Sequence, residues 1–375
     1  MSTTTTEAPP GILIPSLPND VALQCLARVP RQYHPVLAAV SKPIRSLLSS
    51  PELFAARSSL NSTESLLYLT IRSLYGKPKG WFTVYGRRSN TNDDNKSNII
   101  VAPVPGVPKD RLDWSDCAAV GSKIYVVGGI NCVSYSTKVW IFDCRFHTWE
   151  RGPGMPTVRS QAAKTVVLDS KIYVIGCWTE KKSWVLVFDT VARSWETLPS
   201  PKLGVYNERV VGCTIRGGKV CVWLEREEIR FDPATETWEV FESGVRPGFH
   251  WTAQMCEVNG VLYCADEDTR TIRGLNERNG IWKELKLVNN RGLPNRFRDP
   301  CMVNVGGRLV IMGLGYPRDE IFTSELELWC AEIEVKMDRD GDLLGEVLWS
   351  KLVFSMSSLL VDMEPLFYTC LPVSF

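Results

Sequence analysis

The chain has 375 residues, of which 44% are hydrophobic and 23% charged, an ordinary globular composition that suits one large and one small domain, or two medium ones. Its 43 basic and 42 acidic residues leave a formal charge of +1, so no net field favours binding to nucleic acid or to a membrane surface. No apolar run approaches the roughly 20 residues that a membrane-spanning helix needs. The aromatic content of 10%, with many Gly and Pro, predicts short strands joined by tight turns.

Residues 1–11, MSTTTTEAPPG, are predicted to be a disordered tail. They lack a basic start and an apolar core, so a secretory signal is not expected there. The 12 cysteines are scattered and include no CxxC pair. Without an export signal we expect reduced, buried thiols and a protein of the cytoplasm, the nucleus or both.

Residues 12–60 are predicted to form a small helical unit. Asn19 and Asp20 are good N-cap residues for a helix over Val21–Val29, which Pro30 stops. A second helix is expected over His34–Val40. Later start signals are Ser41 with Pro43 in the first turn, and Ser50-Pro51-Glu52 before a helix over Leu53–Leu60.

This helical unit is too small to be stable alone, so some of its apolar residues must face a partner or the rest of the chain. Residues 14–54 resemble the F-box, particularly that of plant F-box/kelch proteins. The Leu17-Pro18 opening, the Val29-Pro30 break and the VSK-x-x-R-S-L-L-x-S-P-E-L run over 40–53 carry the resemblance. It implies docking on a Skp-type linker, which attaches to a cullin scaffold. The positions implied to supply the apolar contact are Leu17, Pro18, Val21, Leu26, Val29 and Pro30. The alternative is a helical cap that only stabilises the rest of the chain.

Four copies of one turn follow in the remaining chain, residues 61–375. An Asp or Asn precedes a Trp by six positions in each copy, and the four Trp residues are 46, 43 and 44 positions apart. We predict that the acidic or amide residue caps backbone NH groups two residues on, and that the Trp covers the edge between neighbouring sheets. The pairs are Asp143 with Trp149, Asp189 with Trp195, Asp232 with Trp238, and Asn276 with Trp282.

A second hairpin is expected upstream of each turn. Its signals are Gly121-Ser122, Asp169-Ser170, Gly217-Gly218, Asn259-Gly260 and Gly306-Gly307, each followed by a strongly β run. Two hairpins per repeat make four antiparallel strands in about 45 residues, a period typical of a propeller. The alternative is a β-sandwich, which has no reason for so regular a period.

These repeats resemble kelch repeats, from about Glu64 onwards. The fold class is therefore expected to be α+β and multidomain: a small N-terminal helical F-box, then an all-β kelch-type propeller of about six four-stranded blades. The repeats are placed at roughly 64–113, 114–157, 158–204, 205–247, 248–292 and 293–375. The first repeat shows only three evident strands, so the tail over 366–375 is predicted to supply its innermost strand and to close the ring.

No pattern for catalysis, a cofactor or a metal is present. His34, His147 and His250 are too dispersed in sequence for a clustered histidine site. The stretch Asp338–Asp342 suggests a calcium loop, but its Gly is misplaced for an EF-hand, and a charged hairpin tip is the preferred interpretation. We expect no enzyme, although some kelch-like propellers are metal-dependent oxidases.

The loops that lead into the inner strands, and those that link second to third strands, are predicted to share one face of the ring. They are rich in Arg, Tyr and Trp, the residue types that dominate binding hot spots, and the excess of Arg favours acidic partners. The candidate substrate-binding residues are Arg159, Trp178, Tyr206, Arg209, Arg246, His250, Trp251, Arg298, Tyr316 and Arg318.

The predicted function is that of a substrate-recognition subunit of a Skp–cullin–F-box ubiquitin ligase. Its helical unit would hold the linker and, through it, the cullin, while the propeller would hold an unidentified target protein for ubiquitination. The alternative is a kelch scaffold outside any ligase that sequesters its partner. Linker binding separates these two readings.

Overall fold

The computed structural model describes most of the chain. The described residues are 12–73, 78–86, 99–108, 115–131, 134–159, 163–176, 184–201, 210–225, 227–241, 255–266, 271–276, 280–289, 293, 298–315, 325–357 and 365–375. The predicted tail over 1–11 lies outside them. No helix among the described residues is long and apolar enough to cross a membrane.

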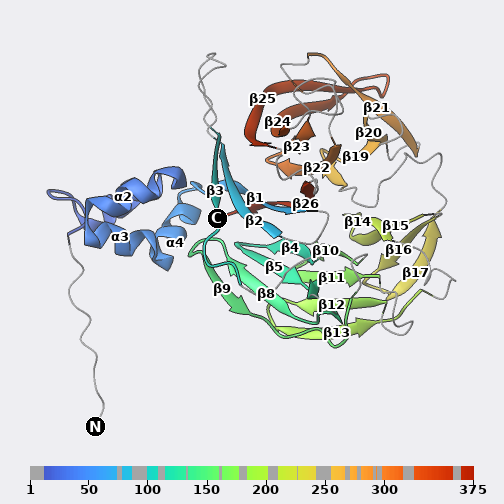
Figure 1. The fold of residues 1–375 in the computed structure, drawn as a ribbon, viewed down its shortest axis with the longest axis horizontal. Helices are drawn as coiled ribbons and strands as arrows, with labels where there is room; N and C mark the ends of the chain where they lie inside the picture. The colour runs from blue at the N-terminus through green and yellow to red at the C-terminus, as the bar shows by residue number, and fades with distance from the viewer. Residues whose placement is uncertain are drawn as a thin grey trace, which may run out of the picture.

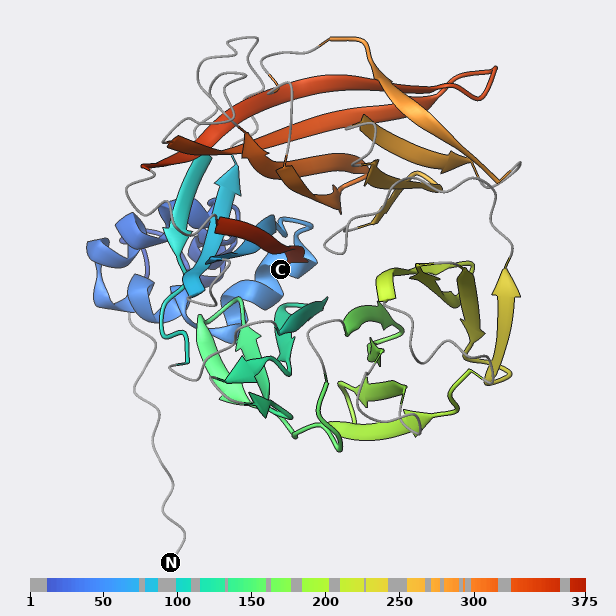
Figure 2. The ribbon, with the colours of Figure 1, turned by 45° about the vertical axis from the view of Figure 1, so that its right-hand side comes forward.

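The helical head has its own small core. Its helices are α1 (Asn19–Ala27), η1 (Arg31–Tyr33), α2 (His34–Val40), α3 (Lys42–Leu48) and α4 (Pro51–Ser59). Leu26, Ile44, Leu47 and Leu53 are among the residues of that core. In Figures 1 and 2 the head lies beside the strand region, next to its first strands.

Two of the predicted helix starts differ from the structure. Helix α1 begins at Asn19, so neither Asn19 nor Asp20 caps it, and the Asn19 Oδ1 accepts a hydrogen bond from the Leu13 NH at 3.1 Å instead. The Ser41 cap is confirmed, because its hydroxyl accepts the Ile44 NH at 3.3 Å. Ser50 occupies the N-cap position of α4 but makes no side-chain cap bond.

The strands form six four-stranded blades around a ring, with a small extra hairpin of β6 (Ile130–Asn131) and β7 (Ser134–Tyr135) (Figures 1 and 2). From inside outwards, blade one has β26 (Pro365–Ser374), β1 (Ser65–Ser73), β2 (Pro78–Gly86) and β3 (Ile99–Pro103). Blade two has β4 (Asp116–Val120), β5 (Lys123–Val127), β8 (Val139–Asp143) and β9 (Thr148–Arg151). Blade three has β10 (Lys164–Leu168), β11 (Lys171–Ile175), β12 (Val185–Asp189) and β13 (Ser194–Leu198).

The remaining three blades follow the same order from inside outwards. Blade four has β14 (Val210–Arg216), β15 (Lys219–Leu224), β16 (Glu228–Asp232) and β17 (Thr237–Phe241). Blade five has β18 (Cys256–Val258), β19 (Val261–Asp266), β20 (Thr271–Asn276) and β21 (Ile281–Leu287). Blade six has β22 (Arg298–Val305), β23 (Arg308–Gly315), β24 (Glu325–Met337) and β25 (Leu343–Ser357).

The predicted ring closure is confirmed. Strand β26 pairs antiparallel with β1 from Ser65 opposite Ser374 to Ser73 opposite Pro365, with one bulge after Thr70. The end of the chain thereby supplies the inner strand that the first repeat lacks. Blades six and one then share a core that includes Leu69, Met312 and Cys370.

The hydrophobic cores lie between neighbouring blades. Blades two and three share Val139 and Phe188, and blades three and four share Trp184 and Phe231. A middle strand such as β11, KIYVI, is therefore buried on both faces and is almost continuously apolar in place of alternating. This packing explains why one repeat cannot be stable alone and why the period persists along the chain.

The tight hairpins between inner and second strands have the predicted primed geometry. Both central residues have positive φ in four of them, at 48° and 61° for Asp169-Ser170 and at 55° and 74° for Gly217-Gly218, for example. A positive φ is a conformation that Gly adopts freely and other residues resist. Ser170 is therefore a strained position, whereas Gly218 is not.

We expect Ser170→Gly to stabilise the protein by about 1 kcal/mol, because Gly removes the cost of a left-handed backbone. The matched change Gly218→Ser, at the equivalent position of blade four, should destabilise it by a similar amount, although an added Cβ meets nothing within 4 Å. The midpoint of urea unfolding, followed by tryptophan fluorescence, measures the change in stability of each variant. Shifts of the same sign for the two variants would contradict this account.

The repeated acid-to-tryptophan turn has the predicted geometry. Asp143, Asp189 and Asp232 each accept, through Oδ1, the backbone NH two residues on, at 3.0, 2.9 and 2.9 Å. For Asn276, the residue two positions on lies outside the described residues; its backbone carbonyl accepts the Gly280 NH at 2.9 Å.

Trp149, Trp195 and Trp238 each pack on the residue before the acid and reach the preceding blade. The rings of Phe188 and Trp195 are 4.9 Å apart, with similar pairs at Phe142–Trp149 and Phe231–Trp238. The indole NH of Trp195 donates to the Pro153 carbonyl at 2.9 Å, and the indoles of Trp149 and Trp238 donate to Pro105 and Pro199. Trp282 lies opposite Leu275 and is buried. Trp149, Trp195 and Trp238 therefore cover the edges between blades, as predicted.

Blades five and six are joined in one eight-stranded sheet, which the repeat pattern does not predict. Their outer strands β21 and β25 pair in parallel, with Leu285 opposite Leu343. Asp342 at the β24–β25 tip accepts Lys283 and Lys286 at 2.9 and 2.6 Å. The tip of the β24–β25 hairpin therefore holds blades five and six together. Within the described residues, no group of three His, Cys, Asp or Glu side chains is arranged to hold a metal.

Candidate functional site

The head presents apolar side chains to solvent. At the start of α1, Leu17 and Val21 are each 39% exposed. Helix α2 buries none of its residues, and its Val36 and Val40 are 69% and 66% exposed, with Tyr33 of η1 beside them at 40%. So many exposed apolar side chains on so small a unit make this surface a candidate docking site.

The predicted linker-binding set is placed unevenly. Leu17, Pro18, Val21 and Pro30 are exposed and Val29 is half-buried. Leu26 is only 4% exposed and packs in the head core, so it supports the surface from below and does not reach a partner directly. The predicted linker-binding set omits Tyr33, Val36 and Val40, which are also exposed. The signal was the helix HPVLAAV itself, which is apolar all round and too short to bury every face.

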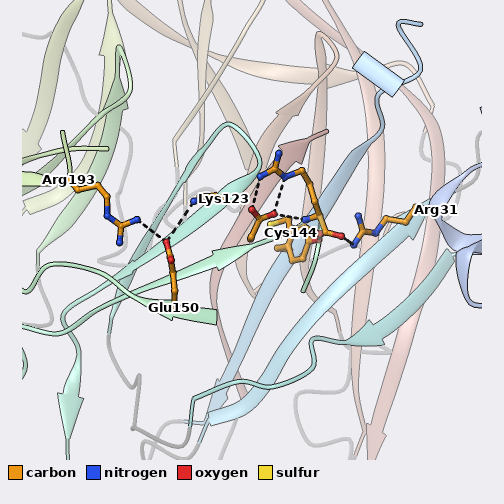
Figure 3. Close-up of polar contacts among 8 residues, drawn as sticks. Arg31, Lys123, Cys144, Glu150 and Arg193 are labelled. Carbon is orange, nitrogen blue, oxygen red and sulfur yellow. Dashed lines mark hydrogen bonds and ion pairs between the residues drawn. The ribbon is translucent and has the colours of Figure 1, made fainter. Parts of the chain in front are cut away.

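Arg31 joins the head to the propeller. Its guanidinium donates to the Arg145 carbonyl and to the His147 Nε2, both at 2.8 Å, and lies over the rings of Phe375 and Phe54, 4.8 and 5.7 Å from their centroids. Figure 3 shows Arg31 pointing to the turn that contains Cys144, from the side opposite the Lys123–Glu150–Arg193 ion pairs of the outer surface. Arg31 is 7% exposed, so its charge is inside this junction.

Glu64 is the acid of the same junction. Its carboxylate accepts the Arg57 guanidinium at 2.7 Å and the Arg31 backbone NH at 2.9 Å. Arg57, itself 2% exposed, also donates to the Val29 carbonyl at 2.9 Å. The head and the start of β1 are thus tied by partly buried hydrogen bonds to charged groups, the stronger class of hydrogen bond.

Two of the three histidines meet at this junction, although they are 113 positions apart in the chain. Burial and the charge of Arg31 lower the pKa of both His34 and His147 to about 4, with Arg57 and His147 adding to the effect at His34. Both rings are therefore neutral at neutral pH. His147 must be neutral to accept the hydrogen bond of Arg31.

We expect the protein to lose stability as the pH falls from about 6.5 towards 4. Above pH 6.5 both histidines are neutral in the folded and the unfolded chain; between 6.5 and 4 the unfolded chain binds protons that the folded one does not, which favours unfolding. Urea midpoints at pH 7.5 and 5.0 measure this loss. His147→Asn, which tolerates the positive φ of 55° at that position, should reduce the difference between the two midpoints. An unchanged difference would show that His147 does not contribute.

The predicted substrate face is represented by few described side chains. Arg159 is only 3% exposed and donates to the Gly176 carbonyl at 3.3 Å, which corrects the expectation of an exposed recognition residue. Buried polar groups need internal partners, and Arg159 supplies one at the end of β11. Arg298 begins β22. The residues Trp178, Tyr206, Arg209, Arg246, His250, Trp251, Tyr316 and Arg318 lie outside the described residues.

The described cysteines are suited to packing and not to nucleophilic chemistry. All are free thiols, and apart from exposed Cys25 and half-buried Cys213 all are buried. Burial raises the pKa of Cys144 and of Cys256 to about 12, so neither is a thiolate at neutral pH. The buried thiols act as small apolar residues, most of them in strands.

Both the helical head and the propeller match known protein families. The F-box domain model matches residues 14–55 and the FKB95 Kelch-repeats domain model matches residues 81–354. Among solved structures, that of YjhT is similar with a TM-score of 0.48 and 14% identity, over 71% of this chain and 90% of YjhT.

Curated relatives match over nearly the whole length. F-box/kelch-repeat protein At4g39590 of Arabidopsis thaliana is 34% identical over 92% of this chain and 87% of its own. F-box/kelch-repeat protein At4g39550 of the same plant is 32% identical over 91% of this chain and 90% of its own. The helical head, the ring of four-stranded blades and these matches together show that the chain belongs to the F-box/kelch-repeat proteins.

Proposed function

We propose that this protein is the substrate-recognition subunit of a Skp–cullin–F-box ubiquitin ligase. The head binds a Skp-type linker, which attaches to a cullin, and the propeller binds a target protein. The observation that carries the proposal is the exposed apolar surface on a head that also matches the F-box domain model. A surface of this kind needs a protein partner, and the family match indicates which kind.

The propeller is proposed to recognise its target by the loops at one face of the ring. Kelch repeats with Arg, Tyr and Trp in those loops favour an acidic segment of a protein partner. Arg159 is excluded from direct contact by its burial and acts as support. Arg209, Arg246, Arg298 and Arg318 remain the basic residues proposed for that contact.

Such a receptor needs no catalytic group of its own. It holds a target lysine near a ubiquitin-conjugating enzyme, and proximity raises the effective concentration of the two reacting groups. The thiols with raised pKa and the neutral buried histidines of the described part are consistent with this division of labour. The propeller and the head then act as one rigid holder.

We expect the intact protein to co-purify with a Skp-type linker and the double variant Leu17→Ala/Pro18→Ala to lose it. Both residues are exposed at the start of α1, so the change removes contact area without opening the head core. The variant must keep the circular dichroism spectrum and the urea midpoint of the unaltered protein. If the intact protein retains no linker while its propeller is folded, the head is vestigial and a sequestering scaffold is the better account.

A further inference from the structure

The strand that closes the propeller ends inside the head junction. The backbone NH of Phe375, the residue after β26, donates to the Glu64 carbonyl at 3.2 Å, and the Glu64 NH donates back to Phe375 at 3.1 Å. The Phe375 ring is 8% exposed. It lies under the Arg31 guanidinium and edge-on to Phe54, 5.9 Å from that ring. The last contacts of the ring-closing strand are therefore made with the head.

Glu64 connects the same two parts from the other side. Its backbone pairs with Phe375, whereas its carboxylate accepts hydrogen bonds from Arg57 and from the Arg31 backbone, both in the head. The residue that extends the β1–β26 ladder is thus also the acid that anchors the head. Movement of the head away from the propeller would break the side-chain bonds and release the end of the ladder.

Arg31 is an unusual residue to bury. Within the described part no carboxylate pairs with its guanidinium, whose acceptors are a carbonyl and a neutral imidazole. A buried charge without a counter-ion is costly, and aromatic faces compensate only in part. An apolar side chain would fill the space at lower cost but would make none of the directional bonds to Arg145 and His147 of blade two. The directional bonds are therefore the feature that distinguishes arginine at this position.

We propose that Arg31 is a positioning residue that clasps the ring-closing strand, so that docking of the head and closure of the propeller are one coupled equilibrium. Arg31 contacts Phe375, the residue after β26 in blade one, and Arg145 and His147 of blade two, so it bridges the closed blade to its neighbour. The head surface and the propeller face then keep a fixed relative position. The clasp itself does not rest on the proposed function; only the use of this fixed position in ubiquitin transfer does.

Hydrogen exchange on the full-length protein tests the clasp without any partner. In Arg31→Ala, the amides of Leu371, Val373 and Phe375 should exchange about tenfold faster, the factor expected for losing a hydrogen bond to a charged group. Amides of β11 in blade three, far from the junction, should be unchanged. Arg28→Ala is the matched control, because Arg28 is exposed at the C-cap of α1 and its guanidinium donates to the Gln24 carbonyl of that helix.

The pattern of exchange decides between positioning and general stability. Equal acceleration in β26 and β11, or no acceleration in β26 while the head helices stay protected, would overturn the proposal. Arg31→Lys keeps a cation over the Phe375 ring and should restore part of the protection. Phe375→Leu removes only the ring and should accelerate the same amides if Arg31→Ala fails to fold. Because linker binding is measured separately, a protein that binds no linker can still show the clasp, and the two ideas fail independently.

Discussion

Leu371→Pro should destabilise the protein by about 2–4 kcal/mol, because it breaks the ladder that closes the ring. Glu64 and Phe375 exchange both of their backbone hydrogen bonds, so alternate residue pairs of the antiparallel ladder do the same. The register then makes Tyr68 and Leu371 a hydrogen-bonded pair and leaves Leu67 and Pro372 unbonded. The natural proline is thereby tolerated, whereas a proline one position earlier removes a needed NH.

Leu371→Ala separates the loss of the side chain from the loss of the hydrogen bond. Leu371 packs against the core between blades one and two, so shortening it has a cost of its own. The proline variant should lose more stability than the alanine variant. The difference between their urea midpoints reports the contribution of the backbone hydrogen bond. Equal midpoints for the two variants would mean that closure through β26 contributes little to stability.

The double variant Val36→Glu/Val40→Glu should weaken linker binding roughly 100-fold, because it places two carboxylates where an apolar contact must be desolvated. The two residues are four apart on α2 and so share one face of it. Helix α2 buries none of its residues, so the change should leave the head folded. Titration calorimetry with a purified Skp-type linker measures the affinity.

Ser58→Glu is the control for this experiment. Ser58 is exposed on α4, so its substitution adds one carboxylate to the head, half the charge added by the double variant, without altering α2. Its affinity for the linker should stay within about twofold of the unaltered protein, since an exposed charge contributes little. An unchanged affinity of the Val36/Val40 variant would remove α2 from the linker surface and leave only the start of α1.

The blades could be predicted from the sequence because their signals are local. Asp189 and Trp195 belong to one turn of six positions, and the capping bonds of Asp189 reach only Val191 and Ala192. The turn at Gly217-Gly218 likewise depends on two adjacent residues. Repetition of such signals determined the blade fold, and the missing inner strand of the first repeat determined the closure by the tail.

The position of the head could not be predicted, because its contacts join residues far apart in the chain. Arg31 is 33 positions from Glu64 and 114 from Arg145, and no local pattern marks an arginine that will be buried between aromatic rings. The same limit applies to Arg159, whose burial depends on how the end of β11 packs. Composition alone suggests an exposed binding residue at that site.

The F-box-like helical head and the ring of kelch-like blades follow from the amino-acid sequence alone, because capping, turn geometry and apolar period are properties of short segments. The merging of blades five and six through β21 and β25, and the link that Arg31 makes between the head and the closing strand, become visible only in the folded protein. Both arrangements depend on surfaces that exist only after the blades have packed. A residue pattern cannot show them, because each of the segments involved would form the same local structure without the other.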